Sequence, residues 1–123
     1  MSEKDRKIRV AISIGDYNGI GIEVILKTLQ EKEITELFTP VIFGSTKLLS
    51  FQKDRLIFDK INFQGIQDAN QIVDGKINVV NLWKDQIDVH FGKVTKEAGE
   101  HAYQSLKAAA QSVTDGFTDV LVT

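Results

Sequence analysis

Apolar and polar residues alternate along the chain with two different periods, which predict strands interleaved with helices. Short apolar runs predict strands at residues 7–14, 40–43, 56–63, 77–82 and 118–123. Apolar positions three or four residues apart predict helices at residues 19–30, 45–53 and 95–114. The polar stretch at residues 64–75 is predicted to be a loop. Strands that alternate with helices favour a largely parallel sheet with helices on its faces.

The longest predicted helix has the clearest boundary signals. Thr95 is a favourable N-cap residue, and Gly116 is typical of the position just after a helix end. The side that we expect to face the core consists of small and branched apolar residues at helical spacing: Ala98, Ala102, Leu106, Ala109 and Val113.

The last predicted strand, at residues 118–123, is apolar and continues to the final residue, Thr123. We expect a buried parallel strand here. A strand of that kind normally leads into a loop at its carboxyl end, where α/β proteins build their sites. A short terminal strand is one interpretation, but we favour the interpretation that the chain is part of a longer protein.

Composition excludes several classes of function. The 15 Lys and Arg are balanced by 17 Asp and Glu, so no basic surface recommends nucleic acid or an anionic membrane as a partner. No apolar run approaches the ~18 residues of a membrane span. The chain has no cysteine, which rules out disulfides and thiolate metal sites and fits a cytoplasmic protein. At 123 residues the chain forms a single α/β domain or a fragment of one, residues 1–123.

The glycine-rich segment after the first strand is the leading candidate for a functional site. Three glycines with the spacing Gly-x-x-x-Gly-x-Gly stand between a predicted strand and a predicted helix. This arrangement can bring backbone N–H groups and a helix N-terminus close to an anionic ligand. Tight turns, Asx turns and helix capping are the structural alternatives. The candidate ligand-binding residues are Gly15, Asp16, Asn18, Gly19 and Gly21.

Two further patterns carry less weight. The glycine spacing together with Tyr103 and Lys107 matches short-chain dehydrogenases, in which a lysine lowers the pKa of a catalytic tyrosine. The expected serine before Tyr103 is missing, and Ile14 stands where Ser or Thr normally precedes the glycines. The two histidines, His90 and His101, are too few for a catalytic zinc site, which needs about three protein ligands.

Three segments together resemble the 4-hydroxythreonine-4-phosphate dehydrogenase family of pyridoxal phosphate biosynthesis. Residues 14–23 read Ile-Gly-Asp-Tyr-Asn-Gly-Ile-Gly-Ile-Glu, where the family often has Gly-Asp-Pro-x-Gly-Ile-Gly-Pro-Glu. Residues 92–99 read Gly-Lys-Val-Thr-Lys-Glu-Ala-Gly, and residues 119–123 resemble the strand that enters the family's next active-site loop. Tyr17 and Ile22 replace the two prolines, and the loss of a proline at position 22 costs rigidity in the first helical turn rather than chemistry.

The resemblance implies an isopropylmalate-dehydrogenase-like fold with three αβα layers, here the N-terminal portion of a larger two-domain enzyme. It also implies a homodimer that uses NAD and a divalent metal. The family's substrate is a small phosphorylated hydroxy amino acid, 4-phosphohydroxy-L-threonine, which is oxidised and decarboxylated with help from the metal.

Only part of that machinery is expected in this chain. The family's metal-binding histidines and main substrate contacts lie beyond Thr123, so we predict no catalytic residue and no metal ligand here. The glycine segment is expected to form a cleft wall in which Asp16 contacts substrate or metal-bound water. The chain alone should be inactive, and its exposed sheet edge should favour aggregation. The alternative is a stand-alone α/β phosphate-binding or interaction module without catalysis.

Overall fold

A five-stranded parallel sheet forms the centre of the protein in the computed structural model, which describes residues 6–56, 61–84 and 87–123. The strand order is β3-β4-β2-β1-β5. The strands are β1 (Ile8–Ser13), β2 (Phe38–Gly44), β3 (Phe63–Ile66), β4 (Ile77–Asn81) and β5 (Val120–Val122). The helices are α1 (Gly21–Leu29), α2 (Glu33–Leu37), α3 (Thr46–Leu56) and α4 (Lys96–Thr114), with a short 3-10 turn, η2 (Ala69–Gln71).

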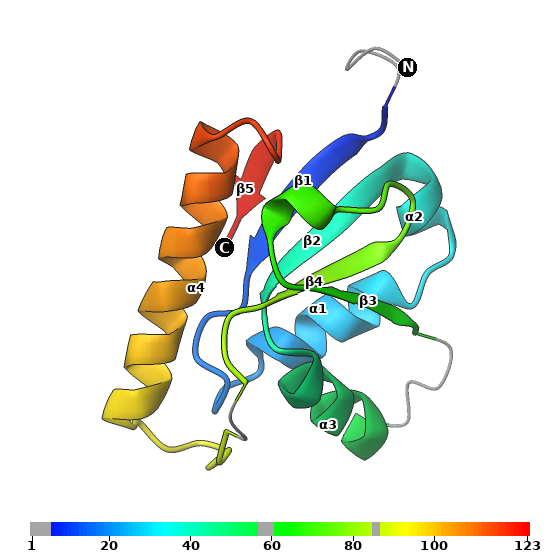
Figure 1. The fold of residues 1–123 in the computed structure, drawn as a ribbon. Helices are drawn as coiled ribbons and strands as arrows, with labels where there is room; N and C mark the ends of the chain where they lie inside the picture. The colour runs from blue at the N-terminus through cyan, green and yellow to red at the C-terminus, as the bar shows by residue number, and fades with distance from the viewer. Residues whose placement is uncertain (1–5, 57–60, 85–86) are drawn as a thin grey trace.

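The helices cover both faces of the sheet and give three layers (Figure 1). Alternate residues of β1 and β2 point to opposite faces. Ile42 packs with Ile22 and Leu26 in the core beneath α1 and α3, whereas Ala11 and Val41 pack with residues of α4. The predicted three-layer α/β fold is therefore confirmed. Within the described residues, no helix has both the length and the apolar character needed to cross a membrane.

The strand predicted at residues 56–63 is contradicted at Leu56 and at residues 61–62, and only Phe63 lies in a strand among the residues described. Leu56 is the last residue of α3. β3 begins at Phe63 and continues to Ile66, so it overlaps the start of the predicted loop at 64–75. Residues 57–60 lie outside the described residues. A short apolar run cannot by itself distinguish a helix end from a strand. The edge strand β3 was missed because its Gln64 and Gly65 are exposed and break the apolar pattern.

The sequence predicts that Pro40 begins a strand, but Pro40 is the third residue of β2. β2 is an inner strand, where a missing N–H normally costs a ladder hydrogen bond. The register explains the exception. Pro40 pairs with Val10 of β1, but pairing with β4 begins only at Val41, so Pro40 has a strand neighbour on one side only.

The boundaries of α4 are as predicted. The side chain of Thr95 accepts a hydrogen bond from the N–H of Ala98 at 3.2 Å, and Gly116 follows the helix with φ +81°. The predicted buried side is only partly correct. Ala98 and Ala109 are buried, but Leu106 is 41% exposed.

Two serines occupy buried positions of α4 instead. Ser105 donates to the carbonyl of Phe43 at 2.5 Å, and Ser112 donates to the carbonyl of Ala109 at 2.7 Å. Because these hydroxyls are hydrogen-bonded, the helix can turn a polar side toward the sheet without leaving buried groups unpaired.

β5 is an exposed edge strand rather than the buried strand that the sequence suggested. Among the residues that the structure describes, β5 pairs only with β1, and Val120, Leu121 and Val122 are 45%, 36% and 52% exposed. Apolar character predicted burial, but an edge position leaves one side of the strand without a neighbour.

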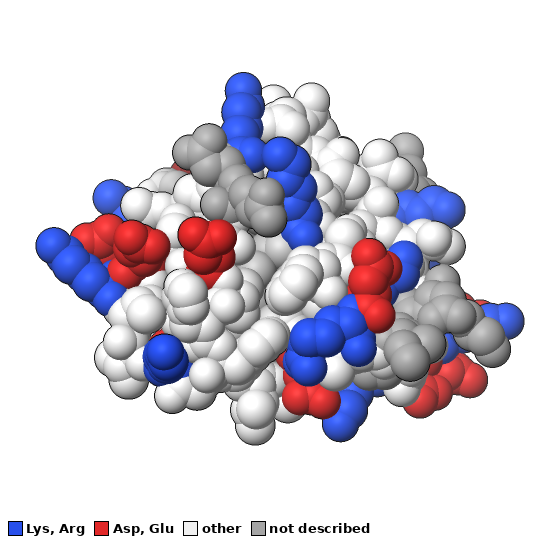
Figure 2. Space-filling model, turned by 90° about the horizontal axis from the view of Figure 1, so that it is seen from below, with Lys and Arg blue, Asp and Glu red and all other residues white. Residues whose placement is uncertain are grey.

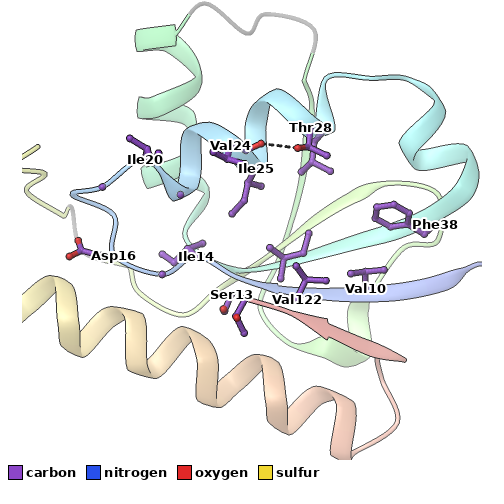
Figure 3. Close-up of a pocket in the computed structure, with 16 residues that line it drawn as sticks. Val10, Ser13, Ile14, Asp16, Ile20, Val24, Ile25, Thr28, Phe38 and Val122 are labelled. Carbon is purple, nitrogen blue, oxygen red and sulfur yellow. Dashed lines mark hydrogen bonds between the residues drawn. The ribbon is translucent and has the colours of Figure 1, made fainter. Parts of the chain in front are cut away.

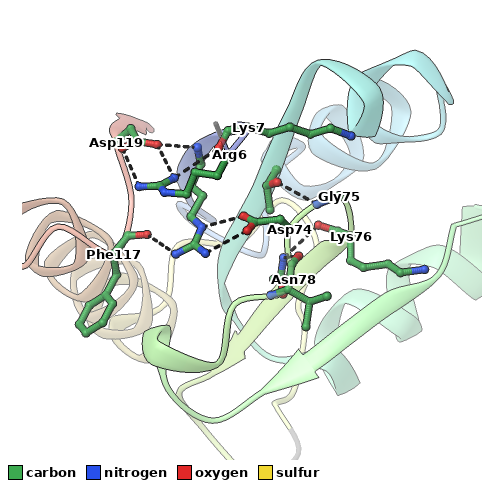
Figure 4. Close-up of polar contacts among 11 residues, drawn as sticks. Arg6, Lys7, Asp74, Gly75, Lys76, Asn78, Phe117 and Asp119 are labelled. Carbon is green, nitrogen blue, oxygen red and sulfur yellow. Dashed lines mark hydrogen bonds and ion pairs between the residues drawn. The ribbon is translucent and has the colours of Figure 1, made fainter. Parts of the chain in front are cut away.

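Ion pairs hold the start of β5 against the start of β1 (Figure 4). Arg6 donates two hydrogen bonds to Asp119, at 2.8 and 3.0 Å, and the N–H of Arg9 donates to the same carboxylate at 2.8 Å. The guanidinium of Arg9 binds Asp74 through two hydrogen bonds, at 2.8 and 3.2 Å, and reaches the carbonyl of Phe117. These four charged residues, Arg6, Arg9, Asp74 and Asp119, form the amino-end network.

Candidate functional site

The glycine loop, residues 14–20, connects the carboxyl end of β1 to the first turn of α1. Gly15 has φ +65°, a conformation that residues with side chains rarely adopt. The carbonyl of Asp16 then accepts the N–H of Gly19 at 3.1 Å, and its Oδ1 accepts the N–H of Asn18 at 2.8 Å. The segment is therefore a tight turn with one carboxylate oxygen already in use.

A cavity of about 540 Å³ lies beside this loop, between α1, β1 and β5 (Figure 3). Its polar end is formed by the loop. Its remaining walls are mostly apolar and include residues of α1 and three strands: Val10, Ile12, Val24, Ile25, Phe38 and Val122. The predicted cleft wall thus borders a real concavity, but one with more apolar lining than a site for a phosphorylated ligand alone requires.

Four of the five candidate residues line the cavity: Gly15, Asp16, Gly19 and Gly21. Asn18, the fifth, does not line it and is only 3% exposed. Its side chain accepts the N–H of His90 at 2.7 Å and donates to Thr95 at 3.2 Å. Those contacts leave Asn18 facing the protein interior, so direct ligand contact by its side chain is not supported.

Steric space separates the roles of the three glycines. Gly15 is required by its positive φ. A Cβ at Gly19 would meet nothing nearer than the Asp16 carbonyl at 3.5 Å, and one at Gly21 nothing nearer than the Ile14 carbonyl at 3.4 Å. Both are ordinary van der Waals distances, so the fold does not by itself explain glycine at these two positions. Close approach of another molecule to the backbone would explain it.

The electrostatics at the start of α1 suit a polar or anionic group. The N-cap position is Ile20, which supplies no side-chain acceptor for the first N–H groups of the helix. These groups carry the positive end of the helix dipole. Glu23 lies in the first turn, but its carboxylate is 3.6 Å from Lys27 and that charge is partly offset.

Sequence reasoning missed the role of Tyr17. Its side chain is 1% exposed, and its hydroxyl lies 3.0 Å from Nδ1 of His101 on α4. Burial raises the pKa of Tyr17, and the negative charges of Glu97, Asp16 and Asp88 raise it further. The phenol therefore stays protonated at neutral pH. His101 also packs edge-on against Trp83, with 4.5 Å between ring centroids.

The histidines form no metal centre in the part of the chain that the structure describes. No three His, Cys, Asp or Glu side chains there lie close enough together to hold an ion. His101 contacts Tyr17 and Trp83 instead.

Tyr103 and Lys107, the pair that matches short-chain dehydrogenases, lie away from the glycine loop. Tyr103 is 66% exposed and shares a shallow hollow on the surface of α4 with Lys96 and Lys107. None of these residues lines the cavity beside the glycine loop. A catalytic partnership between Tyr103 and the glycine loop is therefore not supported.

Figure 2 shows one end of the molecule as a space-filling surface. Lysine and arginine are interspersed there with acidic side chains, and uncharged surface separates them. This face carries no continuous basic patch, in agreement with the balanced composition.

Comparisons with known proteins identify a family for this chain. The family described as pyridoxal phosphate biosynthetic protein PdxA matches residues 36–123. The chain is 38% identical over 120 residues to a 4-hydroxythreonine-4-phosphate dehydrogenase of Bacteroides thetaiotaomicron, a match that covers 98% of this chain and 33% of that protein. It is 28% identical over 121 residues to a protein of Oceanobacillus iheyensis provisionally named as a D-threonate 4-phosphate dehydrogenase, covering 96% and 36% of the two chains.

The fold has a close counterpart among solved structures. The crystal structure of a 4-hydroxythreonine-4-phosphate dehydrogenase from Burkholderia phymatum superposes with a TM-score of 0.83 at 26% identity, covering 95% of this chain and 36% of that one. The chain thus spans about a third of the length of the relatives that it matches. On the family match, this chain belongs to the PdxA family of pyridoxal phosphate biosynthetic proteins.

Proposed function

We propose that this chain supplies the glycine-loop wall of the active site of a dehydrogenase that acts on 4-phosphohydroxy-L-threonine. The observation that carries the proposal is the position of Gly15, Asp16, Gly19 and Gly21 around one end of a cavity, in a chain of this family. The name of the Bacteroides relative supports a phosphorylated hydroxythreonine as the substrate. As in the resemblance described above, the complete enzyme uses NAD and a divalent metal and works as a homodimer.

The proposed work of the loop is binding and orientation. The uncapped N–H groups of α1 and the backbone at Gly19 and Gly21 attract and orient an anionic or hydroxyl group of the substrate. Asp16 uses Oδ1 to fix its own turn. No other described residue bonds to its Oδ2, the atom that would accept a substrate hydroxyl under this proposal.

The described residues do not fit a metal site, because no suitable group of ligands is present among them. We assign no residue of this chain to the metal or to NAD and derive no step through either. Under this proposal their ligands belong to the other two thirds of the family's length.

A chimeric enzyme tests the proposal. This chain replaces the aligned third of the Bacteroides dehydrogenase, and NADH formation is followed with 4-phosphohydroxy-L-threonine. We expect activity that metal chelation abolishes. A chimera that is folded by circular dichroism but inactive, while the parent enzyme is active, would contradict the proposal. D-threonate 4-phosphate is the control substrate: a shift of kcat/KM toward it would assign this wall to the other group of relatives.

A further inference from the structure

Buried polar contacts connect the glycine loop to the segment that precedes α4. The side chain of Asn18 accepts the N–H of His90 at 2.7 Å and donates to Thr95 at 3.2 Å. The backbone carbonyl of Asn18 accepts the N–H of Gly92 at 2.9 Å. One residue of the loop thus makes three contacts with residues 90–95, more than 70 positions away in the chain.

Helix α4 adds two further contacts to the same region. His101 meets the hydroxyl of Tyr17 at 3.0 Å, and one turn later Ser105 accepts the N–H of Ile14 at 3.0 Å. His101 and Ser105 are four residues apart, so they lie on the same side of the helix. The loop is therefore tied at its beginning and in its middle to α4 and its N-cap.

Few hydrogen bonds form within the loop itself, although its apolar side chains Ile14 and Tyr17 are buried in the core. Its internal hydrogen bonds both involve Asp16, and its other side borders the cavity. Gly15 and Gly19 also make the unfolded loop unusually flexible. The contacts from outside the loop must then supply most of its order.

We propose that Asn18 is a positioning residue that fixes the glycine loop against residues 90–95, and that these two sequence motifs act as one unit. Asn18 does not touch the ligand in this scheme. It sets the direction of the N–H groups and of Asp16, which do. Its importance for catalysis rests on the proposed function above, but its effect on the loop does not.

Hydrogen exchange of the 123-residue chain, measured by mass spectrometry at low concentration, tests the positioning role directly. In Asn18→Ala, peptides covering residues 15–20 and 90–93 should exchange about tenfold faster, which corresponds to about 1.4 kcal/mol and is the scale expected when a buried hydrogen bond is lost. Peptides from β4 should be unchanged. Unaltered exchange in both loop peptides would overturn the proposal.

Asn81 provides a matched control. It also stands at the carboxyl end of a strand, and its Oδ1 accepts two hydrogen bonds from Thr46, at 2.7 and 3.0 Å. Asn81→Ala should speed exchange at the start of α3 and leave the glycine loop unchanged. If it loosens the glycine loop equally, the effect of Asn18 is not specific and the proposal fails.

A conservative variant covers the case in which Asn18→Ala unfolds the chain. Asn18→Asp keeps an acceptor for the N–H of His90, and the Thr95 hydroxyl can donate to it. We expect it to restore slow exchange at both loop peptides. Folded Asn18→Asp with fast-exchanging loop peptides would overturn the proposal.

Kinetics of the chimera separate positioning from general stability. At a temperature well below melting, Asn18→Ala should raise KM about tenfold with a smaller change in kcat, and Asn18→Asp should recover most of the loss. If exchange rises but neither kinetic constant moves, the positioning role in catalysis is rejected. If Asp16→Ala also leaves both kinetic constants of the chimera unchanged, the loop is not a substrate wall. Failure of the proposed function can thus be distinguished from failure of the positioning role alone.

Discussion

The two ends of β1 are built in opposite ways. At its amino end, Arg6 and Arg9 meet Asp74 and Asp119 in charged, bidentate contacts. At its carboxyl end, a glycine loop exposes backbone groups and one partly used carboxylate, that of Asp16, beside a cavity. Acidic side chains occur at both ends, but those at the amino end are fully engaged. The difference indicates that the first end maintains the fold and the second is available for a ligand.

The largest expected effect belongs to the carboxyl end. Asp16→Ala in the chimeric enzyme should lower kcat/KM by at least about tenfold, the scale of losing one well-placed polar contact. The melting temperature should change little, because Asp16 is exposed and its side chain bonds, among the described residues, only to the N–H of Asn18 in its own turn. Asp115→Ala is the control, since Asp115 is also exposed and, among the described residues, its carboxylate accepts a hydrogen bond only from Gln111 of α4. Equal activity of Asp16→Ala and the unmodified chimera would contradict a ligand-binding role for the carboxyl end of β1.

Asp119→Ala should produce the opposite result at the amino end. It removes the acceptor for Arg6 and for the N–H of Arg9 and leaves both donors without their partner. We expect a loss of about 1–2 kcal/mol in the free energy of unfolding, reduced by solvent because the Asp119 side chain is 39% exposed. Urea denaturation measures it. A large loss of chimera activity at unchanged stability would mean that the two ends do not divide their roles in this way.

Acid should act on the amino-end network. Hydrogen bonds from Arg9 lower the pKa of Asp74. For Asp119, burial opposes the shift, but hydrogen bonds from Arg9 and Arg6 lower the pKa overall. A carboxylate with a lowered folded pKa adds stability above its unfolded pKa and loses it as pH falls through the folded value. The free energy of unfolding should therefore decrease as the pH falls below about 4.

Denaturation curves of the unmodified chain and of Asp119→Asn between neutral pH and pH 2 check this dependence. The variant should show a shallower fall, because one of the two linked carboxylates has been removed. Parallel curves for the two proteins would show that acid acts somewhere else.

The smallest stability effect is expected at the exposed edge of β5. Val120→Lys places a charge on an apolar strand that has no neighbour on one side. Charges on edge strands oppose edge-to-edge association. Light scattering should show less aggregation, with a change of only a few tenths of a kcal/mol in stability. A monomeric unmodified chain with a sharp, reversible melting transition would contradict the expectation of low solubility.

The sequence predicted the features that depend on local rules. The position of the glycine loop, the cap at Thr95 and the parallel alternation of strands and helices all follow from neighbouring residues. Features that depend on distant contacts were missed. Asn18 has a capping or turn role by local rules, and only the fold brings it to His90. The buried Ser105 contradicts a pattern based on hydrophobicity because a hydrogen bond compensates its polarity.

Strand order also has a consequence for how the protein is made. β1 lies between β2, which follows it closely in the chain, and β5, which follows only after β3, β4 and α4. A ribosome adds about 5–20 residues per second. The nascent chain therefore waits several seconds or more with one flank of its first strand unpaired, which makes that flank a natural place for a chaperone to bind during translation.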